Sequence, residues 1–150
     1  MIGTHLDDAR AANALRRQPN VAATVAGFGR ITTAVVPIGV VGPQSIGVAY
    51  STLPTHFAEQ LLRAGGVAEL CGFALDDDGN VVNAKLERHC LSISPAQLRQ
   101  VHRVILAASN PAKARAVRAA CQSGIVNELV LDVELAQELL RFPPIRQVGD

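Results

Sequence analysis

The sequence predicts an α/β fold in which a Rossmann-like parallel sheet is flanked by helices. From residue 104 onward, short apolar strands alternate with helical patterns, in the order strand, helix, strand, helix that is typical of βαβ units. Apolar residues make up 49% of the chain but aromatic residues only 3%, so the core must consist of Val, Leu, Ile and Ala, which suits such a sheet. The length of 150 residues fits one domain, and no linker interrupts residues 1–150.

The first two thirds of the chain predict three helices and two longer strands. Helices are expected over 4–17, with Thr4 and Asp7 at its start, over 21–28, and from Pro54 to the glycines at 65–66. The β-branched run 32–41 and the run 67–75 are expected to be single buried strands. Residues 76–80 should form a turn, and residues 83–93 a loop with a short strand.

The last third carries the clearest helix signals. Ser94 and Gln97 have the spacing of a capping box, with Pro95 at the first helical position. Strands are expected over 104–108 and 128–131. Asn110 should cap a helix that Gly124 ends, and Asp132 should cap the next one.

Composition excludes several classes of protein. The net charge is +1 and the basic residues are scattered, so no nucleic-acid-binding surface is expected within this chain. No apolar run approaches the ~20 residues of a membrane span, and the N-terminus is unlike a signal peptide. Three cysteines without Cys-x-x-Cys spacing indicate reduced thiols and no zinc site. We therefore expect a cytoplasmic protein with no metal and no cofactor.

Local motifs give no evidence for an enzyme. The acidic run 76–79 does not fit a calcium loop, because Lys85 would stand at the position of the bidentate glutamate. The pair Gly27 and Gly29 lacks the third glycine of a dinucleotide-binding loop. The four histidines show no metal-binding spacing, and no catalytic residues are predicted.

Lys113 is the first candidate for a ligand-binding residue. It lies near the start of the helix that Asn110 caps, where a cation opposes the helix macrodipole. A bound anion would explain its position, because free amides and an ammonium group together form a phosphate site. Ser109 and Asn110 would line the same end of the sheet. An ordinary surface lysine is the alternative.

Glu69, Gly39 and Gly42 are the other candidates. Glu69 lies inside an apolar run, so its carboxylate should be paired with an Arg or Lys, exposed, or used to accept hydrogen bonds from sugar hydroxyls. Gly39 and Gly42 follow a strand, at the edge where open α/β sheets bind ligands. A simple tight turn would explain the two glycines equally well.

Several segments of the chain, taken in order, resemble the SorC family of bacterial sugar-binding transcriptional regulators. The segments that carry the resemblance are Pro19–Val21, Ala34–Gly39, Ala64–Phe73, Asp78-Gly79, Leu91–Ser94, Gln97-Leu98, Val104–Ala108, Lys113-Ala114, Val126-Asn127 and Leu129–Asp132. They match the end of that family's effector domain, and the resemblance covers about the whole chain.

The resemblance implies a fold akin to ribose-5-phosphate isomerase and glucosamine-6-phosphate deaminase, and a sugar or sugar phosphate as ligand. Glu69 matches the acidic residue of the family's "Gly-Asp/Glu" motif, and Lys113 matches the lysine of its phosphate-contacting loop. Ser109 and Asn110 stand where the family has two glycines. Neither the family's helix-turn-helix domain nor the first half of its effector domain has a counterpart here.

We therefore expect an effector-binding module of a transcriptional regulator, the C-terminal portion of its sugar-binding domain, that forms a homo-oligomer and meets DNA only through a domain absent from this chain. A sugar-phosphate isomerase or deaminase is a second hypothesis, although no acid/base pair is evident near Glu69. A module without ligand, which self-associates through an exposed sheet edge or apolar patch, is a third.

Overall fold

The computed structural model describes residues 6, 8–42, 55–82 and 84–145. The helices are α1 (Ala9–Arg16), α2 (Pro19–Gly27), η1 (Phe28–Arg30), α4 (Thr55–Arg63), η2 (Ala84–His89), α5 (Pro95–Leu98), η3 (Pro111–Lys113), α6 (Ala114–Gln122) and α7 (Val133–Leu139), where η marks a 3₁₀ turn. The strands are β1 (Thr33–Val36), β2 (Gly39–Val40), β3 (Ala68–Leu70), β4 (Phe73–Leu75), β5 (Val81–Val82), β6 (Arg103–Ala108) and β7 (Glu128–Leu131).

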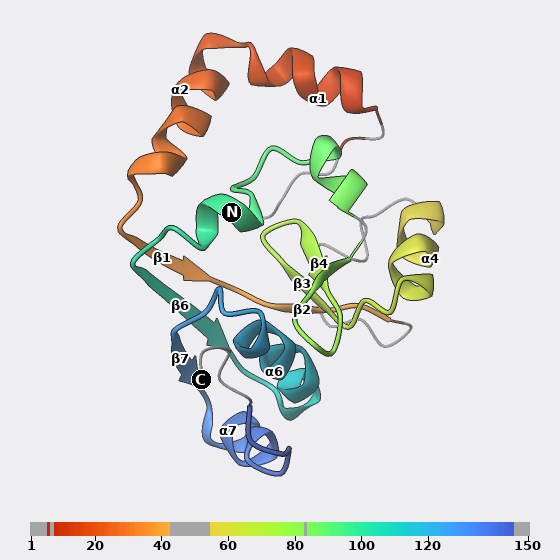
Figure 1. Ribbon diagram of the computed structural model, residues 1–150, viewed down its shortest axis with the longest axis vertical. Coiled ribbons are helices and arrows are strands. Elements are labelled where there is room, and N and C mark those ends of the chain that lie inside the picture. The colour runs from red at the N-terminus through yellow and green to blue at the C-terminus, as the bar shows by residue number, and fades with distance from the viewer. Residues whose placement is uncertain (1–5, 7, 43–54, 83, 146–150) are drawn as a thin grey trace.

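The strands form two sheets (Figure 1). One is parallel, in the order β1-β6-β7, and its strands are connected through helices. The other is an antiparallel meander in the order β2-β3-β4-β5. The predicted α/β class with a parallel sheet flanked by helices is confirmed.

A core of aliphatic side chains joins the two sheets, as the composition predicted. Val104 and Leu106 point from β6 into this core, where they meet Val117 of α6 and Leu135 of α7. Helix α6 also packs against β3 of the second sheet. It therefore holds the two sheets together while covering one face of the parallel sheet.

The run 32–41 was predicted to be one strand, but it forms two. Residues 33–36 pair with β6 in the parallel sheet, and residues 39–40 pair with β3 in the meander. Pro37 lies between them and has no N–H for a sheet ladder, which lets the chain leave the first sheet and enter the second. The strand is also not fully buried, because Val35 is 68% exposed.

The run 67–75 is also not a single strand but a hairpin. Leu70 pairs with Phe73, so Cys71 and Gly72 form a two-residue turn. Their φ angles are 51° and 93°, as in a type I′ turn, which matches the twist of the flanking strands. Cysteine rarely adopts such an angle, and for this reason the sequence did not indicate the turn.

The helix boundaries predicted for the last third are confirmed. The Ser94–Gln97 capping box, the cap by Asp132 and the end of α6 before Gly124 are all present. Asn110 caps the 3₁₀ turn η3, which leads into α6, and not α6 itself. Residues 84–89 form a 3₁₀ turn instead of the predicted loop and short strand.

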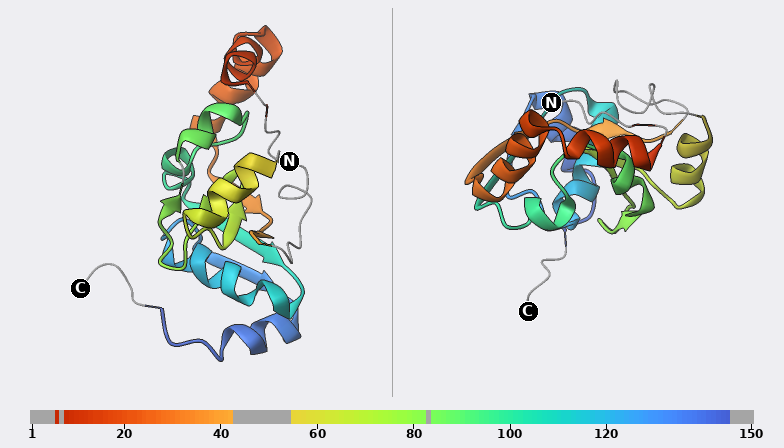
Figure 2. Two further views of the ribbon diagram at one scale, coloured as in Figure 1. Left: turned by 90° about the vertical axis from the view of Figure 1, so that its right-hand side faces the viewer. Right: turned by 90° about the horizontal axis from the view of Figure 1, so that it is seen from above.

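The N-terminal helices differ in detail from the prediction. The start predicted at Thr4 and Asp7 falls outside the described residues, and Asp8 is the N-cap of α1. Helices α1 and α2 form an arm, here called the α1–α2 arm, that extends from the body of the molecule (Figure 2). Its far end returns to η2, where the Leu6 N–H donates to the His89 carbonyl at 2.8 Å.

Candidate functional site

The carboxyl end of β6 forms a rigid loop that leads into α6. Asn110 has a φ of 86°, and its side chain accepts a hydrogen bond from the Ala112 N–H at 3.0 Å. Its own N–H donates to Asp132 Oδ2 at 2.9 Å, so the ends of β6 and β7 are tied together. Ser109 and Asn110 are exposed on this loop. The loop therefore presents fixed polar groups at the edge where a parallel sheet binds ligands.

Lys113 is the last residue of the 3₁₀ turn and directly precedes the first turn of α6. The side chain is half-buried, and among the described residues no carboxylate pairs with its ammonium group. Lys113 caps α6 without a side-chain hydrogen bond. The Lys113 and Ala114 N–H groups already donate to the Asn110 and Pro111 carbonyls, so the ammonium group is the part of this helix start that is available for an anion.

Glu69 and Gly39 face each other across the meander. They form a register pair of β2 and β3, and a Cβ atom on Gly39 would lie 3.2 Å from Glu69 Oε2. Glu69 is only 9% exposed. Glycine at position 39 therefore leaves room beside the carboxylate that any side chain would occupy.

The Glu69 carboxylate has one fixed partner. Oε1 accepts a hydrogen bond from the Gly72 N–H at 2.6 Å, which the type I′ turn directs toward it. Burial raises the pKa of Glu69, and the Gly72 hydrogen bond opposes this shift. Within the described part of the chain no Arg or Lys forms an ion pair with Glu69, and Oε2 is not among the fully buried unpaired atoms. Oε2 is therefore an accessible acceptor, without the cationic partner that was one expectation.

The Lys113 loop and the pair of Gly39 and Glu69 both come after the carboxyl ends of neighbouring parallel strands. Val36 pairs with Leu106. Ser109 follows Leu106 by three residues, and Gly39 follows Val36 by three residues, in β2, after the chain has left the parallel sheet at Pro37. Helix α6, which begins just after Lys113, packs on the strand that carries Glu69. No hydrogen bond or ion pair between the described atoms joins Lys113 to Glu69 directly.

Gly42 lies just beyond β2 and is buried, with a φ of 149° that favours glycine. The residue before it, Val41, donates its N–H to the Val67 carbonyl at 3.1 Å, so this segment continues along the meander. The predicted Gly39-to-Ser45 loop then passes beyond the described residues.

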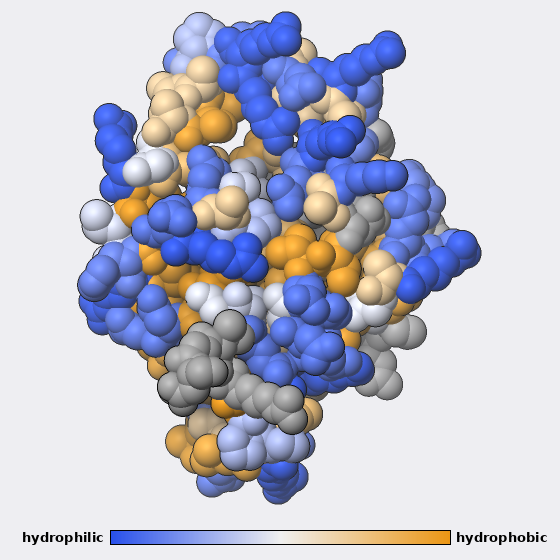
Figure 3. Space-filling model, viewed as in Figure 1, coloured by the Kyte–Doolittle hydropathy of each residue, from blue (hydrophilic) through white to orange (hydrophobic). Residues whose placement is uncertain are grey.

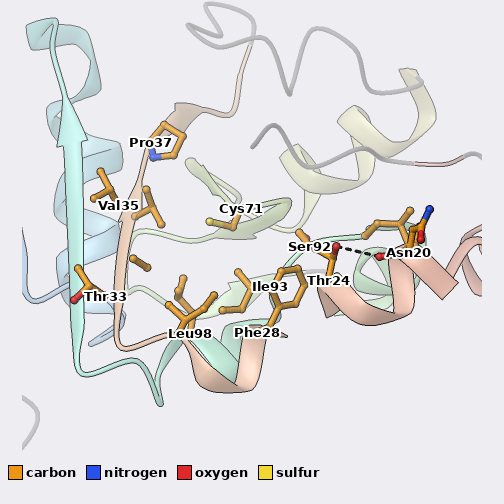
Figure 4. Close-up of a pocket in the computed structure, with 15 residues that line it drawn as sticks. Asn20, Thr24, Phe28, Thr33, Val35, Pro37, Cys71, Ser92, Ile93 and Leu98 are labelled. Atoms are coloured by element: carbon orange, nitrogen blue, oxygen red, sulfur yellow. Dashed lines mark hydrogen bonds between the residues drawn. The ribbon is translucent and has the colours of Figure 1, made fainter. Parts of the chain in front are cut away.

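A cavity that the sequence did not indicate lies elsewhere. It measures about 600 Å³ and lies beside β1, on the side away from β6 (Figure 4). Its lining residues are Asn20, Val21, Thr24, Phe28, Ile31, Thr33, Ala34, Val35, Val36, Pro37, Cys71, Leu91, Ser92, Ile93 and Leu98. None of the six predicted ligand-binding residues lines it, nor a smaller cavity of about 160 Å³ between Arg16, Gly72 and Ser94.

The cavity beside β1 is a poor match to a sugar phosphate. Apolar side chains such as Phe28 and Leu98 dominate its wall, and no charged residue lines it. Thr24, one of its few polar groups, donates its hydroxyl to the Asn20 carbonyl at 3.1 Å. Sugar hydroxyls and a phosphate would find few partners here. The signal in the sequence nearest to this cavity is the apolar face of the helix formed by residues 21, 25 and 28, which we interpreted as a packing face.

The described residues contain no group of three or more His, Cys, Asp or Glu side chains arranged to hold a metal ion. No helix among them has the length and apolar character needed to cross a membrane.

The family model described as "Putative sugar-binding domain" matches residues 2–141, nearly the whole chain. The chain therefore belongs to this family of sugar-binding domains, and the resemblance to SorC-type regulators is confirmed. Among curated proteins, the uncharacterized transcriptional regulator YjhU of Escherichia coli K12 is 28% identical over 135 residues, which cover 90% of this chain and 41% of that protein.

Solved structures share the fold. A domain of a possible sugar-binding transcriptional regulator from Arthrobacter aurescens TC1 has a TM-score of 0.80 and 24% identity, over 91% of this chain and 52% of that one. The full-length sorbitol operon regulator SorC from Klebsiella pneumoniae has a TM-score of 0.79 and 23% identity, over 91% of this chain and 44% of that one. The chain thus spans about half the length, or less, of these relatives.

Proposed function

We propose that this chain is the effector-sensing part of a transcriptional regulator and that its ligand is a phosphorylated sugar. The observation that carries the proposal is the Lys113 ammonium group, which has no carboxylate partner among the described residues and stands at the start of α6, at the carboxyl edge of the parallel sheet. Membership of the sugar-binding family supports a sugar as the remainder of the ligand.

In this proposal the residues around Lys113 bind the phosphate of the ligand, and the residues around Glu69 bind its sugar. Lys113, together with the loop at Ser109 and Asn110, holds the phosphate. Glu69 Oε2 accepts hydrogen bonds from the sugar hydroxyls, in the space that Gly39 leaves open. Gly42 shapes the backbone beyond β2 on the same side of the site.

A regulatory role, and not catalysis, fits this arrangement. The hydrogen-bond partner of Glu69 is the backbone N–H of Gly72. The nearby thiols of Cys71 and Cys90 are poor partners for proton exchange, because burial and the Glu69 charge raise their pKa to about 11 and about 12. Binding would instead shift the population of homo-oligomeric states, by as much as the ligand's affinities for them differ. Such a chain would act in the cytoplasm and meet DNA only through a separate helix-turn-helix domain.

Isothermal titration of the chain with a panel of sugar phosphates, the matching free sugars and inorganic phosphate tests this function. Lys113→Ala should weaken binding of the phosphorylated sugars about 10- to 100-fold, the equivalent of one charged hydrogen bond. The matched control is Lys85→Ala, since Lys85 is the other lysine of the chain and lies exposed on η2. It should leave the affinity unchanged.

Three outcomes would contradict the proposal. Equal affinity for Lys113→Ala and for the unchanged chain would remove the phosphate role of Lys113. Failure of every sugar and sugar phosphate to bind would remove the sensing role. Conversion of ribose 5-phosphate or glucosamine 6-phosphate by the chain would show an enzyme instead.

A further inference from the structure

The turn between β4 and β5, here called the 76–80 turn, is held in one shape by its own hydrogen bonds. Asp76 Oδ1 accepts from the Asp78 N–H at 3.0 Å and from the Asn80 N–H at 2.8 Å. The Gly79 N–H donates to the Asp76 carbonyl at 3.1 Å, and its φ of 80° is one that glycine adopts at little cost. The turn is therefore a rigid part of the meander.

This turn is attached to α6 near both ends of the helix. In the first turn of α6, the Arg115 guanidinium donates two hydrogen bonds to the Asp77 carboxylate, from Nε at 2.7 Å and from Nη2. At the other end, the Gly79 backbone lies so close to α6 that a Cβ atom would be 2.3 Å from the Ser123 nitrogen. The meander lies beside α6 in Figure 1, and the turn fixes its position along the helix.

The attachment joins the two elements that carry the proposed binding groups. Glu69 lies in β3, which pairs with β4, and the 76–80 turn directly follows β4. Lys113 lies two residues before Arg115, next to the start of α6. The distance between the phosphate-binding and the sugar-binding residues therefore depends on how the meander is seated on α6.

The Asp77–Arg115 ion pair contributes orientation more than overall stability. The two side chains are 51% and 62% exposed, and Figure 3 shows hydrophilic side chains over this part of the surface. Ion pairs surrounded by water stabilise a fold only slightly. The hydrogen bonds from Arg115 lower the pKa of Asp77, so the pair stays charged at neutral pH. Its two parallel hydrogen bonds allow only one relative orientation of the groups they join.

We propose that the Asp77–Arg115 ion pair positions the proposed binding site, by setting the distance between its phosphate-binding and its sugar-binding residues. One sugar phosphate can then reach both sets of residues at once, so this inference rests on the proposed function. A phosphate and a sugar that are covalently linked bind better than the separate pieces only where both sets of residues are correctly spaced. Loosening the ion pair removes this advantage but leaves each set of residues intact.

Isothermal titration of the full chain with hexose 6-phosphates, pentose 5-phosphates, their free sugars and inorganic phosphate tests this role. Asp77→Asn keeps the size of the side chain but removes its charge. It should weaken binding of the sugar phosphates about three- to fivefold and leave the affinities for free sugar and inorganic phosphate unchanged. A general loss of stability would not produce this difference, because it would weaken all three kinds of ligand alike.

Asp78→Asn is the matched control. Among the described residues the Asp78 carboxylate has no hydrogen-bond or ion-pair partner, although it is exposed in the same turn. The variant should change none of the affinities. The exchange Asp77→Arg with Arg115→Asp restores an ion pair and should recover part of the lost sugar-phosphate affinity.

Hydrogen exchange of backbone amides gives a second measurement, which needs no ligand. The 76–80 turn and the first turn of α6 should exchange faster in Asp77→Asn than in the unchanged chain, and at the unchanged rate in Asp78→Asn. Unaltered exchange in Asp77→Asn would show that the ion pair does not hold the turn to α6, and would overturn the proposal.

The titration distinguishes failure of this inference from failure of the proposed function. If the unchanged chain binds no sugar phosphate, the proposed function is wrong and the positioning role falls with it. If the unchanged chain binds sugar phosphates and Asp77→Asn binds them equally well, only the positioning role is wrong. Equal weakening for sugar phosphate, free sugar and inorganic phosphate would also contradict the positioning role, since the distance between the two sets of residues does not affect the separate pieces.

Discussion

At the scale of single residues, Glu69 keeps a carboxylate in a largely buried position without a cationic partner among the described residues. Burial raises its pKa above the unfolded value of 4.5, so the folded chain holds this proton to a higher pH than the unfolded chain does. The contribution to stability is fully present below about pH 4.5 and is lost as the pH rises through the folded value.

Glu69→Gln should remove this pH dependence. The amide keeps the Oε1 acceptor for the Gly72 N–H but carries no charge, so the unchanged chain should lose stability relative to the variant between about pH 4 and pH 8. Urea unfolding at both pH values measures the difference. A constant difference would mean that burial does not disfavour the Glu69 carboxylate. In the titration above, the variant should bind free and phosphorylated sugars more weakly.

The backbone at Gly79 lies very close to the backbone at the end of α6. Its φ is 80°, and a Cβ atom would lie 2.3 Å from the Ser123 backbone nitrogen at the end of α6. Gly79→Ala should therefore cost about 3 kcal/mol or more, from strain and overlap together. Gly124→Ala is the control, because Gly124 has a φ of 67° but open space around it, and should cost only about 1 kcal/mol. Equal losses of unfolding free energy in the two variants, measured with urea, would show that the backbone at Gly79 shifts enough to avoid the overlap.

At the scale of elements, Asp132 connects two of them. Oδ1 accepts from the Leu135 N–H at 2.7 Å and caps α7, and Oδ2 accepts from the Asn110 N–H at 2.9 Å and anchors the β6 loop. Asp132→Ala should destabilise the chain by about 2 kcal/mol. Asp132→Asn keeps an acceptor for the cap and should lose less than half of that in urea unfolding. Similar losses in both variants would show that the charge or the hydrogen bond to Asn110, and not the cap, accounts for the stabilisation.

The same loop links stability to the proposed site. The Asn110 φ of 86° is unfavourable for a residue with a side chain, and the two hydrogen bonds of Asn110 hold it there. Asp132→Ala releases one of them and should loosen the loop before α6. Asp132→Asn releases the same bond, because its one amide oxygen stays with the cap of α7. We therefore expect weaker sugar-phosphate binding in both variants than in the unchanged chain, measured by the same titration.

Sequence patterns were informative where the structure depends on neighbours along the chain. The capping box at Ser94 and the caps at Asn110 and Asp132 could be read directly, because each requires one side chain within a few residues of the amides it binds. The alternation of strands and helices after residue 104 predicted the parallel sheet for the same reason. The Cys71-Gly72 turn was missed, because the residue there is not one that such turns favour.

The sequence by itself determined the class of fold, the caps, the family resemblance, and Lys113 and Glu69 as candidates. Only the tertiary structure decided that Pro37 passes the chain between two sheets, that Gly39 leaves space beside Glu69, and that an apolar cavity lies beside β1. Periodicity reports which side of an element is apolar. Whether that side is covered depends on residues distant along the chain, and so on how the whole chain packs.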